Sequence, residues 1–274
     1  MIGDPQSIIL LITGAVIGAV WGSFLNVVIH RTPRLIDAHQ DGLTAKEFLR
    51  GLSWPASHCP KCAHPLRWRD NIPILSYVLL RGRCRTCGQK YGARYLAVEV
   101  LGAVIVAYCA VRFGPGAQAV FASIFGLGLL ALTFIDIQEQ LLPDVIVLPL
   151  LAVGLLFNSL YGAGPIDAVL GGALGFCILW TIRAVYRLAR GIEGMGFGDL
   201  KLAAMIGAWL GLQAIPTVLL VAFMAGVVFM LPLSLLGRLD EKTPVPFGPF
   251  LALGGVMAVV LPNLPALFME FLLP

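Results

Sequence analysis

Apolar runs of about 20 residues recur along this chain, and they constrain its fold more than any other feature. An α-helix needs a run of about this length to cross the hydrocarbon core of a membrane. Only 12% of the residues are charged and the mean hydropathy is +0.88, whereas soluble domains carry roughly 25% charged residues. The sequence therefore predicts an all-α polytopic membrane protein.

We predict eight transmembrane helices, at residues 8–29, 95–113, 117–136, 143–161, 165–187, 199–213, 215–236 and 247–271. The region 199–236 is too long for one helix, so we divide it near GLQAIP (residues 211–216). The alternative is seven spans, with 199–213 as a re-entrant segment. The first run is not expected to be a removable signal peptide, because no basic residue precedes it and its apolar part is too long.

The basic residues fall almost entirely on one side of this arrangement. They lie in the loop 30–94 and around the loops after the fifth and seventh spans, with Arg112 alone on the other side. The positive-inside rule assigns the basic side to the cytosol, so both termini face outward. The net charge of +4 fits this topology and an anionic inner leaflet. We expect the lipid bilayer as a partner, and no nucleic acid.

Three parts follow: a first transmembrane helix (residues 1–29), a small cytosolic insertion (30–94) and a membrane-embedded core (95–274). The insertion contains CPKC (59–62) and CRTC (84–87). Each pair can bring two thiolates to one metal, and two pairs complete a tetrahedral zinc site. We expect a structural zinc ion on Cys59, Cys62, Cys84 and Cys87, because four thiolates leave no position for water. Gly88 suits a turn with positive φ.

Charged residues inside membrane spans are costly and are usually functional. The acidic residues in or at the edge of the apolar segments are Glu99, Asp136, Asp144, Asp167, Asp199 and Glu270. Asp167 and Glu270 fall near predicted outer ends, where solvation is easy. We expect Glu99 to pair with Arg94 or with the zinc insertion.

Asp136 closes the third span and Asp199 opens the sixth, in GMGFGDLKL (194–202). The predicted topology places both at the cytoplasmic ends of their helices, so the two carboxylates can meet at one depth. Carboxylates that share a site cannot both ionise easily, and a shared proton is what an aspartic protease requires. The glycines that precede Asp199 allow close approach of a substrate backbone.

The substrate-contact candidates are therefore Gly194, Gly196, Gly198 and Lys201. Two other roles are open to Lys201, which can pair with Asp199 or extend to lipid headgroups. A nucleotide-binding turn is not expected here, because such a turn follows a strand in a βαβ unit. Aspartates in membrane spans also serve proton-coupled transporters, so the residues alone leave a protease and a transporter open.

Several stretches together resemble the bacterial type IV prepilin peptidases, also called prepilin leader peptidase/N-methyltransferases. They are GSFLNVVIHRTPR (22–34), CPKC and CRTCG, ARYLAVE (93–99), IDIQEQLLPD (135–144) and GMGFGDLKL (194–202). The GxGD element is also similar to that of presenilin-like intramembrane aspartyl proteases. The resemblance covers nearly the whole chain and is specific in its order and combination.

The resemblance implies a bifunctional enzyme of the bacterial inner membrane, in a type IV pilus or type II secretion system. It would cleave the basic leader of prepilins or pseudopilins after a glycine and methylate the new terminal amine with S-adenosylmethionine. By resemblance, Asp136 and Asp199 are the catalytic aspartates, with Asp144 as the less favoured partner, and the four cysteines bind zinc.

No soluble methyltransferase pattern is present, so we place the methyl-donor pocket only loosely, near Arg94 to Glu99. Glu139 is a candidate counter-charge for the basic leader, because the insertion itself is basic. The alternative function is a proton-coupled transporter or a zinc-ribbon membrane assembly factor.

Overall fold

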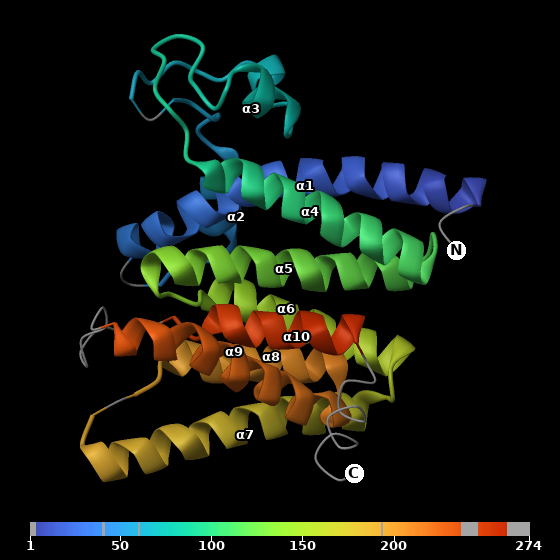
Figure 1. Ribbon diagram of the computed structural model, residues 1–274, viewed down its shortest axis with the longest axis vertical. Coiled ribbons are helices and arrows are strands. Elements are labelled where there is room, and N and C mark those ends of the chain that lie inside the picture. The colour runs from blue at the N-terminus through green and yellow to red at the C-terminus, as the bar shows by residue number, and fades with distance from the viewer. Residues whose placement is uncertain (1–3, 40–41, 60, 193, 237–245, 262–274) are drawn as a thin grey trace. The chain divides into compact units, whose positions relative to one another are not determined.

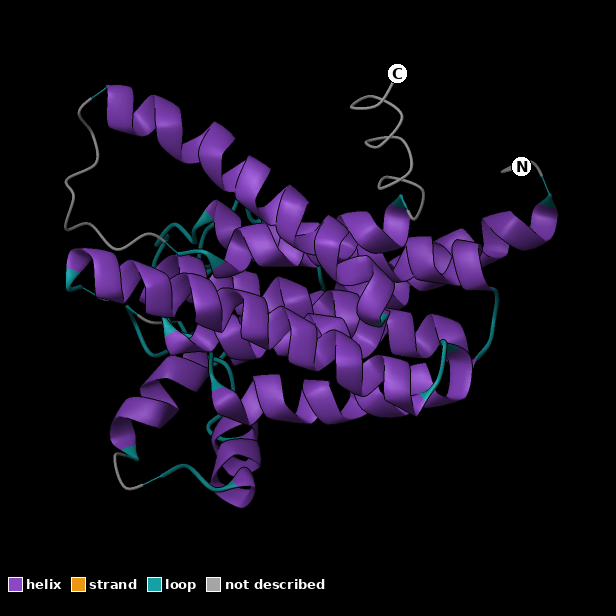
Figure 2. Ribbon diagram, turned by 90° about the horizontal axis from the view of Figure 1, so that it is seen from below, coloured by secondary structure: helices purple, strands orange, loops and turns teal. Residues whose placement is uncertain are grey.

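The computed structural model describes residues 4–39, 42–59, 61–192, 194–236 and 246–261. Within these ranges every regular element is a helix, accompanied by two isolated β-bridges (Figures 1 and 2). The chain divides into two compact units, residues 1–131 and 132–274. Helix α5 (Ala117–Glu139) runs across this boundary.

Among the described residues, six stretches are long and apolar enough to cross a membrane, which agrees with the predicted all-α polytopic membrane protein. Five are α1 (Pro5–Ala38), α4 (Ala93–Phe113), α5, α6 (Asp144–Tyr161) and α7 (Pro165–Arg190), and the sixth is Leu212–Pro232. The last combines η2 (Leu212–Ala214) with most of α9 (Ile215–Leu235).

Two predicted spans are shorter than a membrane-crossing helix in the structure. Helix α8 (Phe197–Leu210) has 14 residues and α10 (Gly248–Val260) has 13, whereas about 20 are needed. Gly211 ends α8 with a φ of 81°. Residues 262–271 of the predicted last span, Glu270 among them, lie outside the described residues, as do Arg238 and Lys242. The count of eight spans therefore remains a prediction.

In the first unit, α1 and α4 pack closely side by side (Figure 1). A Cβ atom added at Gly22 would lie 2.8 Å from the Glu99 Cα, and one added at Gly14 would lie 2.8 Å from the Ala107 Cα. Small residues thus allow the two backbones to approach, as is common between membrane helices.

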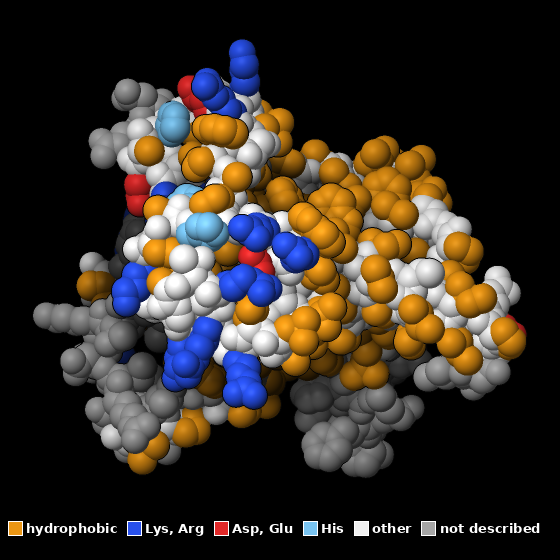
Figure 3. Space-filling model, turned by 90° about the horizontal axis from the view of Figure 1, so that it is seen from above, with side chains coloured by type: hydrophobic (Ala, Val, Ile, Leu, Met, Phe, Trp, Pro, Cys, Tyr) orange, Lys and Arg blue, Asp and Glu red, His pale blue; other side chains and the backbone are white. Residues whose placement is uncertain are grey.

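Helix α1 continues nine residues beyond the predicted end at Ile29, to Ala38. The insertion that follows it contains α2 (Ala45–Ser53), η1 (Trp68–Asn71) and α3 (Leu75–Leu79). Helix α2 begins with a capping box formed by Thr44 and Glu47. Figure 3 shows the molecule from above the view of Figure 1. Lys and Arg side chains gather toward one end of the face seen there, and hydrophobic side chains cover much of the other end.

In the second unit, α8 is almost entirely buried against α6, α7 and α10 (Figure 1). Its apolar side chains from Leu200 to Trp209 form much of the core of this unit. Helix α10 also packs against α9. The burial of α8 fixes the position of its first turn, which carries Asp199.

Candidate active site and metal centre

Asp136 lies in the last turn of α5 and is buried, with 4% of its surface exposed. Its Oδ2 atom accepts a hydrogen bond of 3.0 Å from the backbone N–H of Gly248. Gly248 is the first residue of α10, and the free N–H groups at a helix N-terminus favour a negative charge. Asp136 is therefore held by a backbone donor from a helix far along the chain.

Asp199 lies in the first turn of α8 and is also buried, with 8% exposed. Asp136 and Asp199 belong to the same compact unit, and one apolar side chain borders both sites. Leu142 lies beside both sites, because Cβ atoms added at Gly198 and Gly248 would approach it at 2.9 and 3.4 Å. The structure thus places both aspartates beside Leu142, and their pairing in catalysis stays a prediction.

Gly248 was missed by sequence reasoning. A Cβ atom at this position would lie 2.6 Å from Oδ2 of Asp136, so only glycine leaves the carboxylate its present place. Its stretch, PVPFGPF (residues 244–250), has no spacing that links it to IDIQEQLLPD. A glycine between Phe247 and Pro249 at a helix start was the only local signal.

Lys201 pairs with Asp144 and not with Asp199. Its Nζ atom lies 2.7 and 2.6 Å from the two carboxylate oxygens of Asp144, and this pair is partly exposed. The ion pair with Asp199 was therefore wrong, because residues two apart on a helix do not face each other. Asp144 is 54% exposed at its side chain, unlike the two buried aspartates.

The three glycines before Asp199 do not have positive φ angles. Gly196 is extended and caps α8, and a Cβ added there would lie 3.4 Å from Oδ2 of Asp199. Gly194 and Gly196 are exposed. Cβ atoms added at Gly194 and Gly198 would instead meet Tyr186 at 2.5 Å and Leu142 at 2.9 Å. The role of the three glycines in substrate contact stays a prediction.

The four cysteines of the insertion form one cluster. Their Sγ atoms all lie within 4.8 Å of one another, with Cys59–Cys87 at 3.7 Å and Cys62–Cys84 at 4.0 Å. Zinc–sulfur bonds of about 2.3 Å in a tetrahedron place sulfurs about 3.8 Å apart. The donor set and its spacing therefore fit one zinc ion.

The two cysteine turns have the same backbone hydrogen bonds. The first joins Cys59 N–H to the His64 carbonyl at 3.0 Å, and the second joins Cys84 N–H to the Gln89 carbonyl at 2.8 Å. Gly88 has a φ of 69°, which confirms the prediction of positive φ, while Ala63 has a φ of 54° at the same place in the first turn.

Backbone N–H groups also act on the sulfur atoms of this cluster. Those of Cys87 and Thr86 lower the pKa of Cys84 to about 6, which favours the thiolate that binds metal. His58 is exposed and its ring lies 3.0 Å from the Ala56 carbonyl oxygen. It is not part of the four-cysteine cluster.

Glu99 connects α4 to the insertion. Its Oε2 atom accepts a hydrogen bond of 2.7 Å from the backbone N–H of Ile74, and Ile74 has a positive φ of 62°. The carboxylate thus fixes the turn that precedes α3. This agrees with the expected contact between Glu99 and the zinc insertion.

Asp167 has a structural role in the second unit. Its Oδ1 atom accepts a hydrogen bond of 3.3 Å from the backbone N–H of Leu212. This hydrogen bond joins the start of α7 to the turn after α8, so Asp167 is assigned no catalytic role.

Comparisons with known proteins agree on one family. The profile of the bacterial peptidase A24 N-terminal domain matches residues 16–113, and that of the type IV leader peptidase family matches residues 123–231. No solved structure matches the chain.

Three similar proteins are each named prepilin leader peptidase/N-methyltransferase. The one from Aeromonas salmonicida (strain A449) is 43% identical over 251 residues, which cover 87% of this chain and 86% of the relative. The one from Burkholderia pseudomallei (strain K96243) is 45% identical over 258 residues, covering 88% and 82%. The one from Pseudomonas aeruginosa is 40% identical over 255 residues, covering 89% and 88%. This chain therefore belongs to the type IV leader peptidase family, the family of the prepilin leader peptidase/N-methyltransferases.

Proposed function

We propose that this protein cleaves the basic leader of type IV prepilins or pseudopilins after a glycine and then methylates the newly exposed amine. The observation that carries this proposal is the buried pair of Asp136 and Asp199, in a chain of this family. Buried aspartates also occur in proton-coupled transporters, so it is the family of the chain that favours a peptidase over the alternative functions.

The two carboxylates provide what peptide hydrolysis requires. The ionised member of the pair takes a proton from water, whose oxygen attacks the carbonyl carbon of the scissile bond, while the protonated member donates to the carbonyl oxygen. The C–N bond then breaks as a proton passes to the departing amine. Gly248 N–H holds the Asp136 carboxylate in place throughout.

The topology belongs to the same proposal. The basic loops lie in the cytosol, so the insertion (30–94) and the aspartate pair of the core (95–274) face the cytoplasmic side of the inner membrane. With α8 and α10 counted as spans, seven spans follow the first transmembrane helix (residues 1–29), which makes eight in all. Its partners are prepilin or pseudopilin substrates and the lipid bilayer, with no nucleic acid.

Zinc in this proposal is structural, because the four cysteines occupy all of its coordination positions. S-adenosylmethionine supplies the methyl group for the second reaction when it is bound. The insertion has too few residues to form a separate methyltransferase domain. The binding site for this methyl donor must therefore include residues of the membrane helices.

The experiment that tests the proposed function uses the purified protein in liposomes with a prepilin that has a basic leader. The products are read by mass spectrometry, with and without S-adenosylmethionine. Loss of the leader after the glycine, followed by gain of one methyl group, is expected. An intact prepilin in the presence of folded, zinc-loaded protein would contradict the proposal.

Gly248→Ala is expected to lower the turnover number for leader cleavage about 10- to 100-fold, the cost of a displaced catalytic group. The added methyl group would lie 2.6 Å from Oδ2 of Asp136, so the carboxylate must move. Gly226→Ala is the matched control, because its methyl group would come no closer than 3.8 Å to its nearest neighbour. Equal rates for the two variants would remove the positioning role of Gly248.

Glu139→Lys is expected to raise the KM for a basic-leader prepilin about fivefold, the size of an exposed ion-pair effect, with little change in turnover. Glu139 is the exposed last residue of α5, three positions beyond Asp136. Asp37→Lys makes the same charge reversal at an exposed position of the other unit. If both reversals leave KM unchanged, Glu139 is not the counter-charge of the leader.

A further inference from the structure

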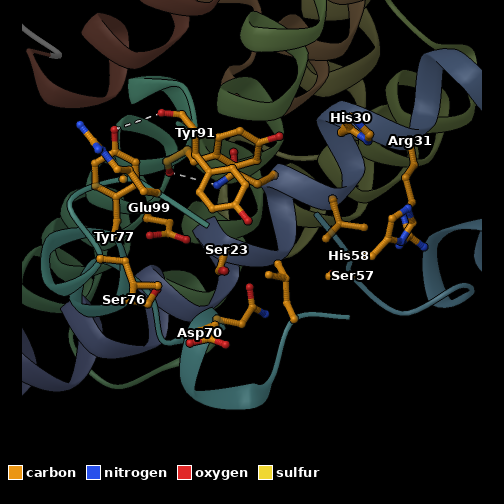
Figure 4. A pocket seen from close by; sticks show the side chains of 18 residues that line it. Ser23, His30, Arg31, Ser57, His58, Asp70, Ser76, Tyr77, Tyr91 and Glu99 are labelled. Atoms are coloured by element: carbon orange, nitrogen blue, oxygen red, sulfur yellow. Dashed lines mark hydrogen bonds between the residues drawn. The ribbon is translucent and has the colours of Figure 1, made fainter. Parts of the chain in front are cut away.

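A cleft that contains several polar side chains lies in the first unit, where α1 and α4 meet the insertion (Figure 4). Its polar lining includes Ser23, Asn26, His30, Tyr91, Tyr95 and Glu99. Its cavity volume is about 190 Å³, or about 1070 Å³ of atom-free space when the region open to solvent is counted. The cleft can thus enclose one end of a medium-sized ligand and leave the other in its mouth.

Asn26 is buried in this cleft with one polar atom unsatisfied. Its Nδ2 atom donates to the carbonyl oxygen of Tyr95 at 3.0 Å and lies 3.4 Å from that of Gly22. These two carbonyls fix the orientation of the amide, and its Oδ1 atom has no hydrogen-bond partner although the residue is only 5% exposed. A buried acceptor of this kind is costly unless a ligand supplies an N–H or O–H donor.

Glu99 places its carboxyl group in the same cleft. One of its oxygens is held by Ile74 N–H at 2.7 Å, so the carboxylate has a fixed position. The other acid of the cleft, Asp70, is paired with Arg85 at 2.8 Å. Glu99 is therefore placed to bind a cationic group of a ligand.

Aromatic and basic groups complete the lining. Tyr91 and Tyr95 pack edge to face, with ring centroids 6.1 Å apart, and aromatic rings bind both planar bases and cations. Figure 4 shows Tyr77 and Tyr91 on the side of Glu99, with His30, Arg31 and His58 together on the other side. The cleft thus has an acidic, aromatic end and a basic end.

We infer that this cleft binds S-adenosylmethionine, with the carboxylate of Glu99 facing the positive charge of the ligand and Oδ1 of Asn26 accepting one of its N–H groups. This ligand combines a sulfonium, an ammonium, a carboxylate and an aromatic amine, and each has a complement in the lining. The inference rests on the methyltransferase half of the proposed function. It also narrows the sequence-based expectation of a pocket near residues 94–99 to particular side chains.

Equilibrium binding of S-adenosylmethionine to the full chain in detergent micelles tests this inference without relying on activity. Glu99→Gln is expected to weaken binding about 10- to 100-fold, because a charge-assisted contact becomes a neutral one. The glutamine oxygen can still accept the Ile74 N–H, so the fold is kept. Asn26→Leu, which keeps the side-chain volume but removes Oδ1, is expected to weaken binding about tenfold.

Asp37→Asn is the matched control, since it removes an acid from an exposed position on α1 outside the cleft, and it is expected to bind as the wild type does. Zinc content and thermal unfolding are measured for each variant. Wild-type binding that persists unchanged in Glu99→Gln and Asn26→Leu would overturn the inference and leave the proposed function standing.

Hydrogen–deuterium exchange locates the bound ligand independently. Added S-adenosylmethionine is expected to slow exchange in peptides from residues 72–80 and 91–99, and to leave 144–161 unchanged. Slowing confined to the second unit would place the donor elsewhere. If the wild type neither binds the donor nor methylates a cleaved prepilin, the methyltransferase half of the proposed function fails as well.

Discussion

Asp136→Asn and Asp199→Asn are each expected to lower leader cleavage about 10³-fold or more, within the range that general acid–base groups contribute. Asparagine keeps the shape of the side chain but neither takes a proton from water nor gives one to the departing amine. Initial rates from the mass of the released leader measure the loss.

Asp144→Asn is the control for these variants, because Asp144 is exposed and paired with Lys201. It is expected to cleave within about threefold of the wild-type rate, as suits the loss of a surface ion pair. Methylation of a prepilin that has already been cleaved is expected to continue in all three variants. Cleavage that survives both dyad substitutions would remove Asp136 and Asp199 from the active site.

Cys84→Ser is expected to abolish stoichiometric zinc binding and to unfold the insertion. Binding energies of about 10–16 kcal/mol are typical of structural zinc in small domains, and this insertion has little else to hold it. The apolar side chains of its helix α3, Leu75, Val78 and Leu79, are all exposed, so they form no core. Metal analysis and limited trypsin digestion at the many Lys and Arg residues of 30–94 measure the effect.

Cys177→Ser provides the matched control, since Cys177 is an exposed cysteine of α7 outside the cluster. Trypsin is expected to cut Cys84→Ser within the insertion at least tenfold faster than Cys177→Ser, because an unfolded segment exposes its backbone. Binding of S-adenosylmethionine should also be lost in Cys84→Ser, because Gly82 and Arg83 line the cleft. A Cys84→Ser protein that resists trypsin as well as the wild type would show that zinc does not stabilise the insertion.

Run length and composition were enough to predict most of the membrane helices. Helices α4 to α7 and α9 begin and end within three residues of the predicted bounds, because an apolar run flanked by Gly, Pro or charge leaves little choice. Helix α1 runs longer than its apolar stretch, since tertiary contacts support its polar end. There Arg31 donates to the backbone carbonyls of Gly51, Leu52 and Pro55.

The sequence was enough to predict those parts of the candidate site that depend on depth in the membrane. It was not enough to predict the contacts that depend on how the helices pack. Asp136 and Asp199 were paired because they share a predicted depth. The contact between Asp136 and Gly248 depends on how α10 packs in the second unit, and no residue spacing in the sequence indicates that packing. The partner of Lys201 was likewise set by the packing of α6 on α8.

The measurement that tests the central claim most directly is a double-mutant cycle of leader cleavage. Rates are compared for the wild type, Asp136→Asn, Asp199→Asn and the variant with both substitutions. Catalytic groups that act as one unit are not additive, so the double variant is expected to be no slower than the slower single variant. Losses that multiply would contradict a shared site, because they would mean that the two aspartates act independently.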